Sequence, residues 1–384
     1  MDSLSWGQIL SQIFLLFWPV WTGMLLIFAI SIFTKERTGL YGRLFDSPIG
    51  MIGFAVVMFW ALTAVFADLI VTFDSLQQLS GMKNKPPGTP ARGYEGQYFL
   101  LGGDNLARDV FSRVVMGSRT VLSIAPAATM FAFMMGITLG LAAGYFGGRL
   151  DTALSFLANL VLAFPVILLF YLLVTPEIRV TGIPVFMAAV LFVFPVVFFV
   201  ILINSRTYTQ PVKRNALVAI TLVAGAWAYS GLAFNMDPLG IFYMDPNLLN
   251  IFVSVVFVNS PTVFRIVRGL TLDIKTRDYV AAAQTRGEGP WYIMLWEILP
   301  NARGPLIVDF CLRVGYTTIL LGTLGFFGLG VSPESPDWGS TINEGRKLLS
   351  VFPHPAVPPA VALMSLVLGL NLLADGLREQ SLRD

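Results

Sequence analysis

Long apolar runs alternate with short polar segments along almost the whole chain. An α-helix needs about 20 mostly apolar residues to cross the hydrocarbon core of a bilayer, and one run, between Arg119 and Arg149, holds no charged residue at all. The pattern predicts an all-α polytopic membrane protein with about nine helices. The expected spans are residues 9–33, 49–72, 119–147, 154–175, 183–204, 216–233, 248–265, 303–329 and 354–374.

Composition supports a membrane protein and excludes several other classes. The 384 residues are 55% hydrophobic and 12% charged, about half the charged share of an average soluble domain. A net charge of +2 without any basic run gives no reason to expect nucleic-acid binding. Cys311 and His354 are each the single residue of their type, which excludes an intrachain disulfide and argues against a transition-metal site. We therefore expect no bound metal and no cofactor on this chain.

The first apolar run is expected to remain in the protein. The sequence before it, MDSLSWGQ, contains no Lys or Arg, whereas a cleaved signal peptide has a positive start and a shorter apolar core. Residues 9–33 are therefore interpreted as a membrane helix.

Short basic loops predict the orientation of the spans. Lys and Arg gather in the 34–48, 205–215 and 266–302 loops, whereas residues 234–247 contain none. Cytoplasmic basic loops alternate correctly through all nine spans when the N-terminus is outside and the C-terminus is in the cytoplasm. The long 73–118 loop then lies on the external side.

Three glycines lie four residues apart in the 119–147 span: Gly136, Gly140 and Gly144. This spacing places them on one helix face and lets a second helix approach closely. Ordinary helix packing is one interpretation, and a seam that moves during function is the other.

The segment from Arg277 to Asn301 interrupts the apolar pattern. It begins with helix-forming residues that include three consecutive alanines, turns at Gly287, Gly289 and Pro290, and continues as an apolar-aromatic segment up to Pro300. A short helix with small side chains is suited to a groove on another protein. A connecting loop that lies on lipid headgroups is the alternative.

The same segment resembles the "EAA" coupling loop of ABC importer permeases. Ala282, Ala283, Gly287 and the Leu299-Pro300 pair match that pattern, and Ala281 stands where the family has Glu. The resemblance implies that this loop contacts an ATPase subunit. The implied coupling residues are Tyr279, Ala281, Ala282, Ala283, Arg286, Gly287, Leu299 and Pro300.

Further motifs narrow the resemblance to the second, C-type permease subunit of the oligopeptide/dipeptide/nickel importers. They are similar to the family's elements in order along the chain, although Gly103 and Ala107 replace a Thr and a Gly. The motifs are LGGDNLARDVFSR from Leu101 to Arg113, LAFP from Leu162, PTVFRIVRG from Pro261, FGLG from Phe327 with PDWG from Pro336, and NLLADGLR from Asn371.

The resemblance implies a type I ABC importer transmembrane domain with a six-helix core. Residues 1–48 are then an additional N-terminal helix and cytoplasmic loop, and residues 49–384 are the permease domain. That domain contains the periplasmic loop 73–118, an inserted helix pair at 183–233 and the coupling loop 266–302. Helix 9–33 and the inserted pair fall outside the family's plan, and lipid-facing packing and a partner contact are both open for them.

The resemblance also implies the partners and the location. They are a sister permease that shares the translocation path, two cytoplasmic ATPases that bind ATP-Mg, an external substrate-binding protein and the bacterial inner membrane. The chain has no G-x-x-x-x-G-K-[ST] phosphate loop, so we expect a permease without an enzyme site of its own. Peptides are the commonest cargo of the resembling family, and nickel, opines or sugars remain open.

A charged cluster in the 73–118 loop is the candidate for gating or for docking a partner: Asp104, Arg108, Asp109 and Arg113. Arg108 and Asp109 are suited to charge-assisted contacts with a partner or a peptide carboxylate, and a solvated surface is the alternative. A secondary transporter or a channel is the other functional class. Ionisable residues in the middle of the spans would indicate a secondary transporter, and a polar pore ring would indicate a channel. The spans are mostly uncharged away from their ends, and the sequence shows no polar ring.

We expect reporter fusions at residues 40, 210 and 285 to report the cytoplasm and fusions at 90 and 240 to report the external side. The alternation of basic loops generates this pattern. A cytoplasmic signal at 240 would show that the 183–233 pair does not cross the membrane.

Overall fold

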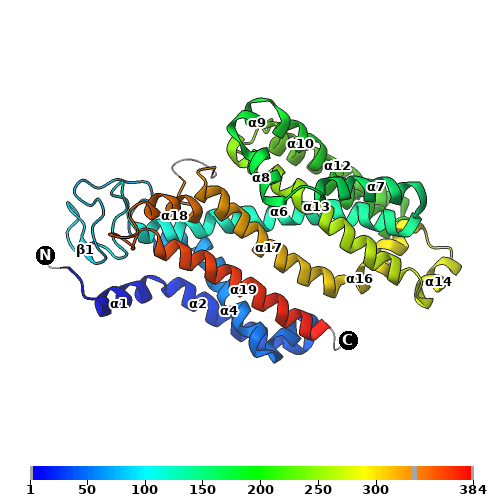
Figure 1. Cartoon of the computed structure of the whole chain (residues 1–384). Helices are drawn as coiled ribbons and strands as arrows, with labels where there is room; N and C mark the ends of the chain where they lie inside the picture. Colours follow the sequence, from blue (N-terminus) through cyan, green and yellow to red (C-terminus); the bar gives the residue numbers. More distant parts are fainter. Residues whose placement is uncertain (1–2, 330–334, 382–384) are drawn as a thin grey trace. The chain divides into compact units, whose positions relative to one another are not determined.

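The computed structural model describes residues 3–329 and 335–381, which are mostly helical (Figure 1). Contacts divide the chain into two compact units. The first comprises Met1–Pro126 with Cys311–Asp384, and the second comprises Ala127–Phe310. This division differs from the expected boundary at residue 48. Helices α6 (Val110–Phe146) and α17 (Arg303–Phe326) belong partly to each unit.

The first unit combines the N-terminal and C-terminal helices with a long loop. Helix α19 lies alongside α4 (Figure 1), and Trp60 of α4 donates a hydrogen bond of 2.9 Å to Ser365 of α19. Two antiparallel strands of two residues each, with Thr89 opposite Phe99, lie in the loop of this otherwise helical unit. The elements are α1 (Trp6–Leu16), α2 (Trp18–Thr34), η1 (Lys35–Arg37), α3 (Leu40–Arg43), η2 (Leu44–Asp46), α4 (Pro48–Val65), α5 (Ala67–Ile70), β1 (Thr89–Pro90), β2 (Tyr98–Phe99), α18 (Trp338–Arg346) and α19 (Val357–Ser381).

The second unit is built around α13, the most deeply buried of the long apolar helices. In its most apolar stretch 72% of the residues are buried, compared with 11% in α12. The elements are α7 (Gly148–Leu162), α8 (Val166–Val174), α9 (Pro176–Val180), α10 (Ile183–Leu191), α11 (Val193–Arg206), α12 (Pro211–Phe234), α13 (Pro246–Ile274), α14 (Asp278–Thr285), α15 (Pro290–Tyr292), the π-helix η3 (Ile293–Ile298) and α16 (Leu299–Asn301).

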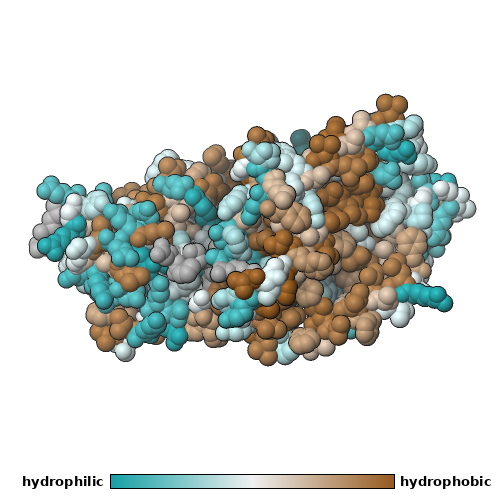
Figure 2. Space-filling model, turned by 90° about the horizontal axis from the view of Figure 1, so that it is seen from above, coloured by the Kyte–Doolittle hydropathy of each residue, from teal (hydrophilic) through white to brown (hydrophobic). Residues whose placement is uncertain are grey.

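The number of candidate spans agrees with the sequence pattern. Within the described residues, eight helices are long and apolar enough to cross a membrane, and a ninth span results if the bent pair α7 and α8 is counted as one. Broad hydrophobic areas cover the surface in Figure 2. Large apolar side chains such as Phe33 and Phe186 are exposed, as expected of residues that face lipid.

Two expected spans are broken by proline. Residues 9–33 form two helices that meet at Phe17, because Pro19 lacks an N–H and its ring would clash with the carbonyl group one turn earlier. Helix α1 has 11 residues, too few to cross a bilayer, and it packs on Leu100 and Phe111 instead. The 154–175 span bends by 82°, since Pro165 disfavours helical backbone at Phe164.

The other boundaries shift by a few residues or more. Helix α6 begins at Val110 rather than at 119, so the long loop that precedes it ends at Asp109 and Arg113 lies on the helix. The 335–353 segment contains a helix, α18, that the apolar pattern did not predict. Gly330, the last residue of the FGLG motif, lies outside the described residues.

The glycine stripe packs against α13. A Cβ atom built on each glycine would lie too close to one side chain of α13. The distance would be 2.5 Å from Gly136 to Val263, 2.8 Å from Gly140 to Val267 and 2.7 Å from Gly144 to Thr271. Those three contact residues are also four apart, so two matched helix faces meet with almost no gap. Close packing of this kind stabilises helix association in lipid, because the hydrophobic effect does not drive two helices together there.

We expect Gly140→Ala to lower the stability of the permease by about 1–3 kcal/mol. The new Cβ would lie 2.9 Å from the carbonyl oxygen of Phe264, so the two backbones would have to separate. Gly269→Ala on α13 is the matched control, because its Cβ would meet no atom within 4 Å and alanine favours the helix by about 1 kcal/mol. Thermal unfolding in detergent measures both variants, and equal melting temperatures would contradict the close α6–α13 contact.

Candidate functional site

The short helix α14 in the predicted coupling loop has a buried face and an exposed face. Val280 and Ala283 are completely buried, three residues apart on one side of the helix. Tyr279, Ala281 and Ala282 are exposed. Two of the three alanines are therefore available to a partner. Ala283 belongs to the core of this chain, which corrects the expectation that all three form the docking surface.

A Schellman motif ends α14 at Gly287. The Gly287 N–H donates to the Gln284 carbonyl at 2.9 Å, and the Glu288 N–H donates to the Ala283 carbonyl at 3.2 Å. Gly287 has a φ of +79° and no atom within 4 Å of a Cβ built on it. The position requires glycine for its backbone conformation and not for space.

The buried face of α14 is anchored to the segment that follows it. Val280 and Ala283 belong to one hydrophobic cluster with Ile293 and Ile298 of η3, against which the half-buried Leu299 also packs. Pro300 has no N–H to donate to the helical turn before it, and the chain widens into a π-helix over that turn. Pro300 itself is exposed.

Polar contacts hold both ends of α14. Before the helix, the Lys275 ammonium donates to the Gly144 carbonyl of α6 at 2.8 Å. After it, the Arg286 guanidinium pairs with Glu297 of η3 at 2.8 Å. The helix is thus connected on one side to the α6–α13 packing and on the other side to the π-helix.

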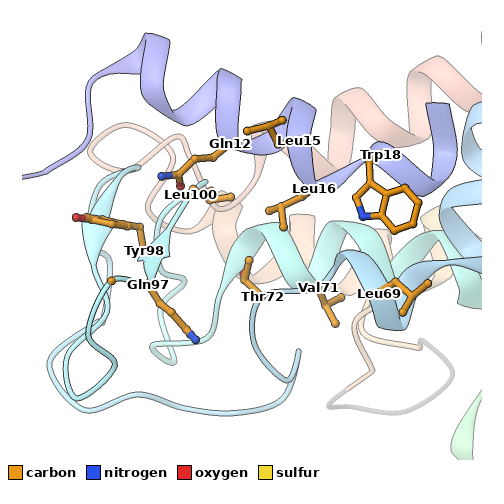
Figure 3. A pocket seen from close by; sticks show the side chains of 11 residues that line it. Gln12, Leu15, Leu16, Trp18, Leu69, Val71, Thr72, Gln97, Tyr98 and Leu100 are labelled. Carbon is orange, nitrogen blue, oxygen red and sulfur yellow. The ribbon is translucent and has the colours of Figure 1, made fainter. Parts of the chain in front are cut away.

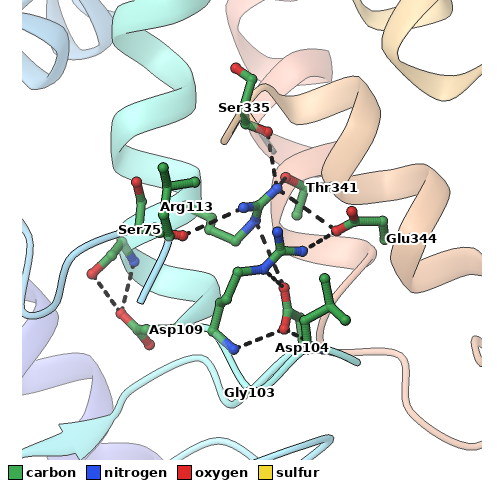
Figure 4. Close-up of polar contacts among 12 residues, drawn as sticks. Ser75, Gly103, Asp104, Asp109, Arg113, Ser335, Thr341 and Glu344 are labelled. Carbon is green, nitrogen blue, oxygen red and sulfur yellow. Dashed lines mark hydrogen bonds and ion pairs between the residues drawn. The ribbon is translucent and has the colours of Figure 1, made fainter. Parts of the chain in front are cut away.

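In the first unit, the charged motif of the long loop forms an ion-pair cluster in which the buried Asp104, Arg108 and Arg113 meet the half-buried Glu344 (Figure 4). Asp104 accepts a hydrogen bond of 2.7 Å from the Arg108 side chain, and Arg108 also pairs with Glu344 of α18. The charges of two arginines and two carboxylates balance, as burial of ions requires.

Arg113 connects three segments from the first turn of α6. Its guanidinium donates to the Ser335 carbonyl and to Thr341 of α18, both at 3.1 Å, and to the Ser75 carbonyl of the loop at 3.5 Å. The side chain is completely buried. These contacts join the loop, α6 and α18 into one body.

This burial changes the interpretation of the charged motif. The expectations of a partner contact and of a solvated surface both placed Asp104, Arg108, Asp109 and Arg113 at the surface. The structure buries all four side chains. Asp104, Arg108 and Arg113 form ion pairs inside the unit, and Asp109 accepts hydrogen bonds from Ser112 and Thr72. In this state they organise the loop and are not available for direct docking.

Asp109 caps the N-terminus of α6. Its carboxylate accepts hydrogen bonds from the Ser112 N–H at 2.9 Å, from the Ser112 hydroxyl at 2.7 Å and from Thr72 at 3.2 Å. Complete burial outweighs these bonds and raises the pKa of Asp109 to about 6.

Ala107, which stands where the resembling motif has glycine, adopts a backbone conformation that favours glycine. It has a φ of +64°, a left-handed conformation in which glycine is unstrained and alanine is not. The family's glycine suits this turn, and in this chain the surrounding hydrogen bonds hold alanine there. The Ala107 N–H donates to the Asp104 carbonyl at 3.1 Å.

Sequence reasoning missed the partners of the buried arginines. Glu344 and Thr341 lie in a segment without an apolar run, far along the chain from the loop. One sequence signal could have pointed to the helix that carries them. Asp337 is a typical helix N-cap and accepts from the Ser340 N–H at 2.9 Å. The helix that it begins contains one acidic residue, Glu344. The completely buried Trp338 follows Asp337, and its indole donates to the Val114 carbonyl at 2.9 Å.

A pocket of about 540 Å³ lies between α1 and the long loop (Figure 3). Gln12, Leu16 and Trp18 line it from the N-terminal helices, and Tyr98 and Leu100 line it from the loop. Its lining residues, all within the described part of the chain, carry no charge, so the pocket offers no ionic partner for the termini of a peptide. The described residues also contain no group of three or more His, Cys, Asp or Glu placed to hold a metal ion.

Comparisons with known proteins agree with these features. Residues 136–381 match the family described as binding-protein-dependent transport system inner membrane component. Residues 41–87 match the N-terminal transmembrane domain of oligopeptide transport permease C.

Named relatives cover most of the chain. A glutathione transport system permease protein, GsiD, of Pectobacterium atrosepticum is 30% identical over 73% of this chain and 70% of its own length. Dipeptide transport system permease proteins, DppC, of Haemophilus influenzae and Alkalihalophilus pseudofirmus are 27% and 26% identical, over 86% and 88% of this chain and 88% and 87% of their own lengths. The chain therefore belongs to the binding-protein-dependent transport system inner membrane components, the permease subunits of ABC importers.

Proposed function

We propose that α14 is the helix through which partner ATPases drive this permease. The observation that carries the proposal is the division of its faces. Ala281 and Ala282 are exposed, whereas Val280 and Ala283 are fixed in the core of the second unit. Small side chains let another protein approach the backbone closely, and the buried face transmits the movement to the helices behind it.

The anchoring of α14 gives the coupling its mechanical path. A displacement of the exposed face would move α13 and η3, because α14 shares a packed cluster with both. ATP binding to the ATPases would then favour one of two arrangements of the spans by its different contacts in each.

Membership of the family supports a proposal for the partners and the cargo. The full transporter would contain this permease, a sister permease, two ATPases that bind ATP-Mg and an external substrate-binding protein, in the bacterial inner membrane with the C-terminus in the cytoplasm. Relatives are named for dipeptide and glutathione transport, so we propose short peptides as the cargo.

The buried ion-pair cluster is proposed to stiffen the external side. It joins the long loop to α6 and α18 through Arg113 and Glu344. Removal of one member of a buried pair typically costs about 3–5 kcal/mol, because the other charge is left without compensation. A loop held in this way would offer the substrate-binding protein a preformed surface.

We expect Ala282→Asp to reduce uptake at least about tenfold, because a charge without a partner would be buried at the ATPase contact. The variant should insert and fold normally, since residue 282 is exposed in the permease. The measurement is dipeptide uptake and ATP turnover by the assembled transporter in liposomes.

Ala282→Ser is the matched control, because it keeps a small and uncharged side chain and should transport nearly as well as the wild type. Gly287→Val should also lower coupling, since a β-branched residue is strained at a φ of +79°. Wild-type ATP turnover and normal ATPase binding in Ala282→Asp would reject the coupling role of α14.

We expect the contribution of Asp109 to the stability of the protein to fall as the pH rises from about 4 to 6. The pKa of Asp109 is raised to about 6 in the fold, against about 3.9 in an unfolded chain. The folded state therefore holds a proton that the unfolded state loses in this window. The resulting stabilisation, about 3 kcal/mol, is complete below about pH 4 and is lost above about pH 6.

Asp109→Asn tests this assignment, because the amide oxygen can still accept from Ser112 and Thr72 while no charge is buried. The variant should be more stable than the wild type above pH 6 and should lose this part of the pH dependence. Thermal unfolding in detergent between pH 4 and 7.5 is the measurement. An unchanged pH profile would show that Asp109 does not titrate in this window.

A further inference from the structure

The inserted helices reach the coupling region through the C-terminal end of α11. The Trp296 indole N–H of η3 donates to the Ser205 hydroxyl at 3.1 Å. The Arg206 guanidinium carbon lies 4.5 Å from the centroid of the Trp296 ring, within the range of a cation–π interaction. Two neighbouring residues of α11 thus hold one aromatic side chain of the π-helix.

One face of α11 continues this contact into the core. Phe198, Ile201 and Leu202 pack against the cluster that contains Val280 and Ala283 of α14. With Ser205, these residues follow the i, i+3, i+4, i+7 spacing of a single helix face. The inserted helix therefore touches both the π-helix and the cluster that buries α14.

Helix α12 supports α11 from another side. The two helices pack along each other, and a Cβ built on Gly225 of α12 would lie 2.8 Å from a methyl carbon of Val196. Only 11% of the most apolar stretch of α12 is buried. Helix α12 therefore packs on α11, and α11 packs on the cluster that buries α14.

Lipid-facing packing alone does not account for the polar part of this contact. A helix that only fills space beside α13 would need apolar side chains, whereas here a hydroxyl and a guanidinium converge on one indole. A cation in the last turn of α11 also suits the helix dipole, but the dipole does not require the guanidinium to lie over Trp296.

The next residue of η3 extends the contact to α14. Glu297 pairs with Arg286, directly after the last residue of α14, at 2.8 Å. A connected path thus runs from α11 through Trp296 and Glu297 to the Schellman turn.

We propose that the inserted helices α10–α12 act as a brace that positions the coupling helix, with Ser205, Arg206 and Trp296 as its positioning residues. The functional part of this proposal rests on the proposed coupling role of α14. The brace gives the inserted pair a mechanical task within this chain: it keeps η3, and through it α14, in the orientation that an ATPase meets.

The test compares Arg206→Gln, Arg206→Lys and Trp296→Leu in nanodiscs. Hydrogen–deuterium exchange over residues 278–287 reports the local opening of α14 in the permease. ATP turnover by the complex with its ATPase subunits reports coupling. Lys213→Gln is the matched control, because it removes the same charge from an exposed position in the first turn of α12.

Arg206→Gln should speed α14 exchange about two- to fivefold, the equilibrium factor expected for an exposed cation–π contact. Arg206→Lys should restore much of the protection, and Lys213→Gln should match the wild type. Trp296→Leu should have a larger effect, and adding Arg206→Gln to it should change nothing further, because the shared contact is already lost. ATP turnover should change in the same order.

Wild-type exchange over α14 in Trp296→Leu would overturn the brace. So would equal effects of Arg206→Gln and Lys213→Gln. Ala282→Asp, measured in parallel, separates the two proposals. If it alters ATP turnover and the brace variants do not, coupling stands and the brace fails. If the brace variants loosen α14 and Ala282→Asp turns over ATP normally, the brace holds α14 and the coupling role fails.

Discussion

The close contact between α6 and α13 is the constraint on which the position of α14 depends. In lipid, helices gain little from the hydrophobic effect and associate through close packing. The faces of Gly136, Gly140 and Gly144 and of Val263, Val267 and Thr271 leave almost no space between them. Because α13 leads directly into α14, the position of α13 fixes where α14 begins. The Lys275 contact with the Gly144 carbonyl continues the same seam.

From that starting point, small features decide what α14 presents. A one-residue difference separates Ala282, which is exposed, from Ala283, which is completely buried. The turn at Gly287 then returns the chain to η3, where Trp296 and Glu297 lie between the inserted helices and the end of α14. Helix α14 is thus held from three directions, by α13, by η3 and, through η3, by α11. In the other unit, ion pairs between two arginines and two carboxylates hold the long loop against α6 and α18.

The membrane spans were predictable from sequence because apolar length alone determines whether a helix can cross a bilayer. The breaks in the 9–33 and 154–175 spans were less predictable. Pro19 and Pro165 marked them, but the outcome depended on where the next helix could pack. The burial of Arg108 and Arg113 was not predictable, because their partner Glu344 lies 236 residues from Arg108. The motif resemblance predicted a coupling loop at the segment that contains α14. It could not divide three similar alanines into exposed and buried positions, since that division depends on the cluster around Val280.

Cysteine accessibility tests the central claim most directly. In a Cys311→Ser background, Ala282→Cys and Ala283→Cys place a thiol on the exposed and the buried face of α14. The account predicts that a maleimide labels position 282 in the isolated permease, that assembly with the ATPase subunits protects it, and that position 283 is unreactive in both states. Equal labelling of position 282 with and without the ATPases would contradict the assignment of this face as the contact.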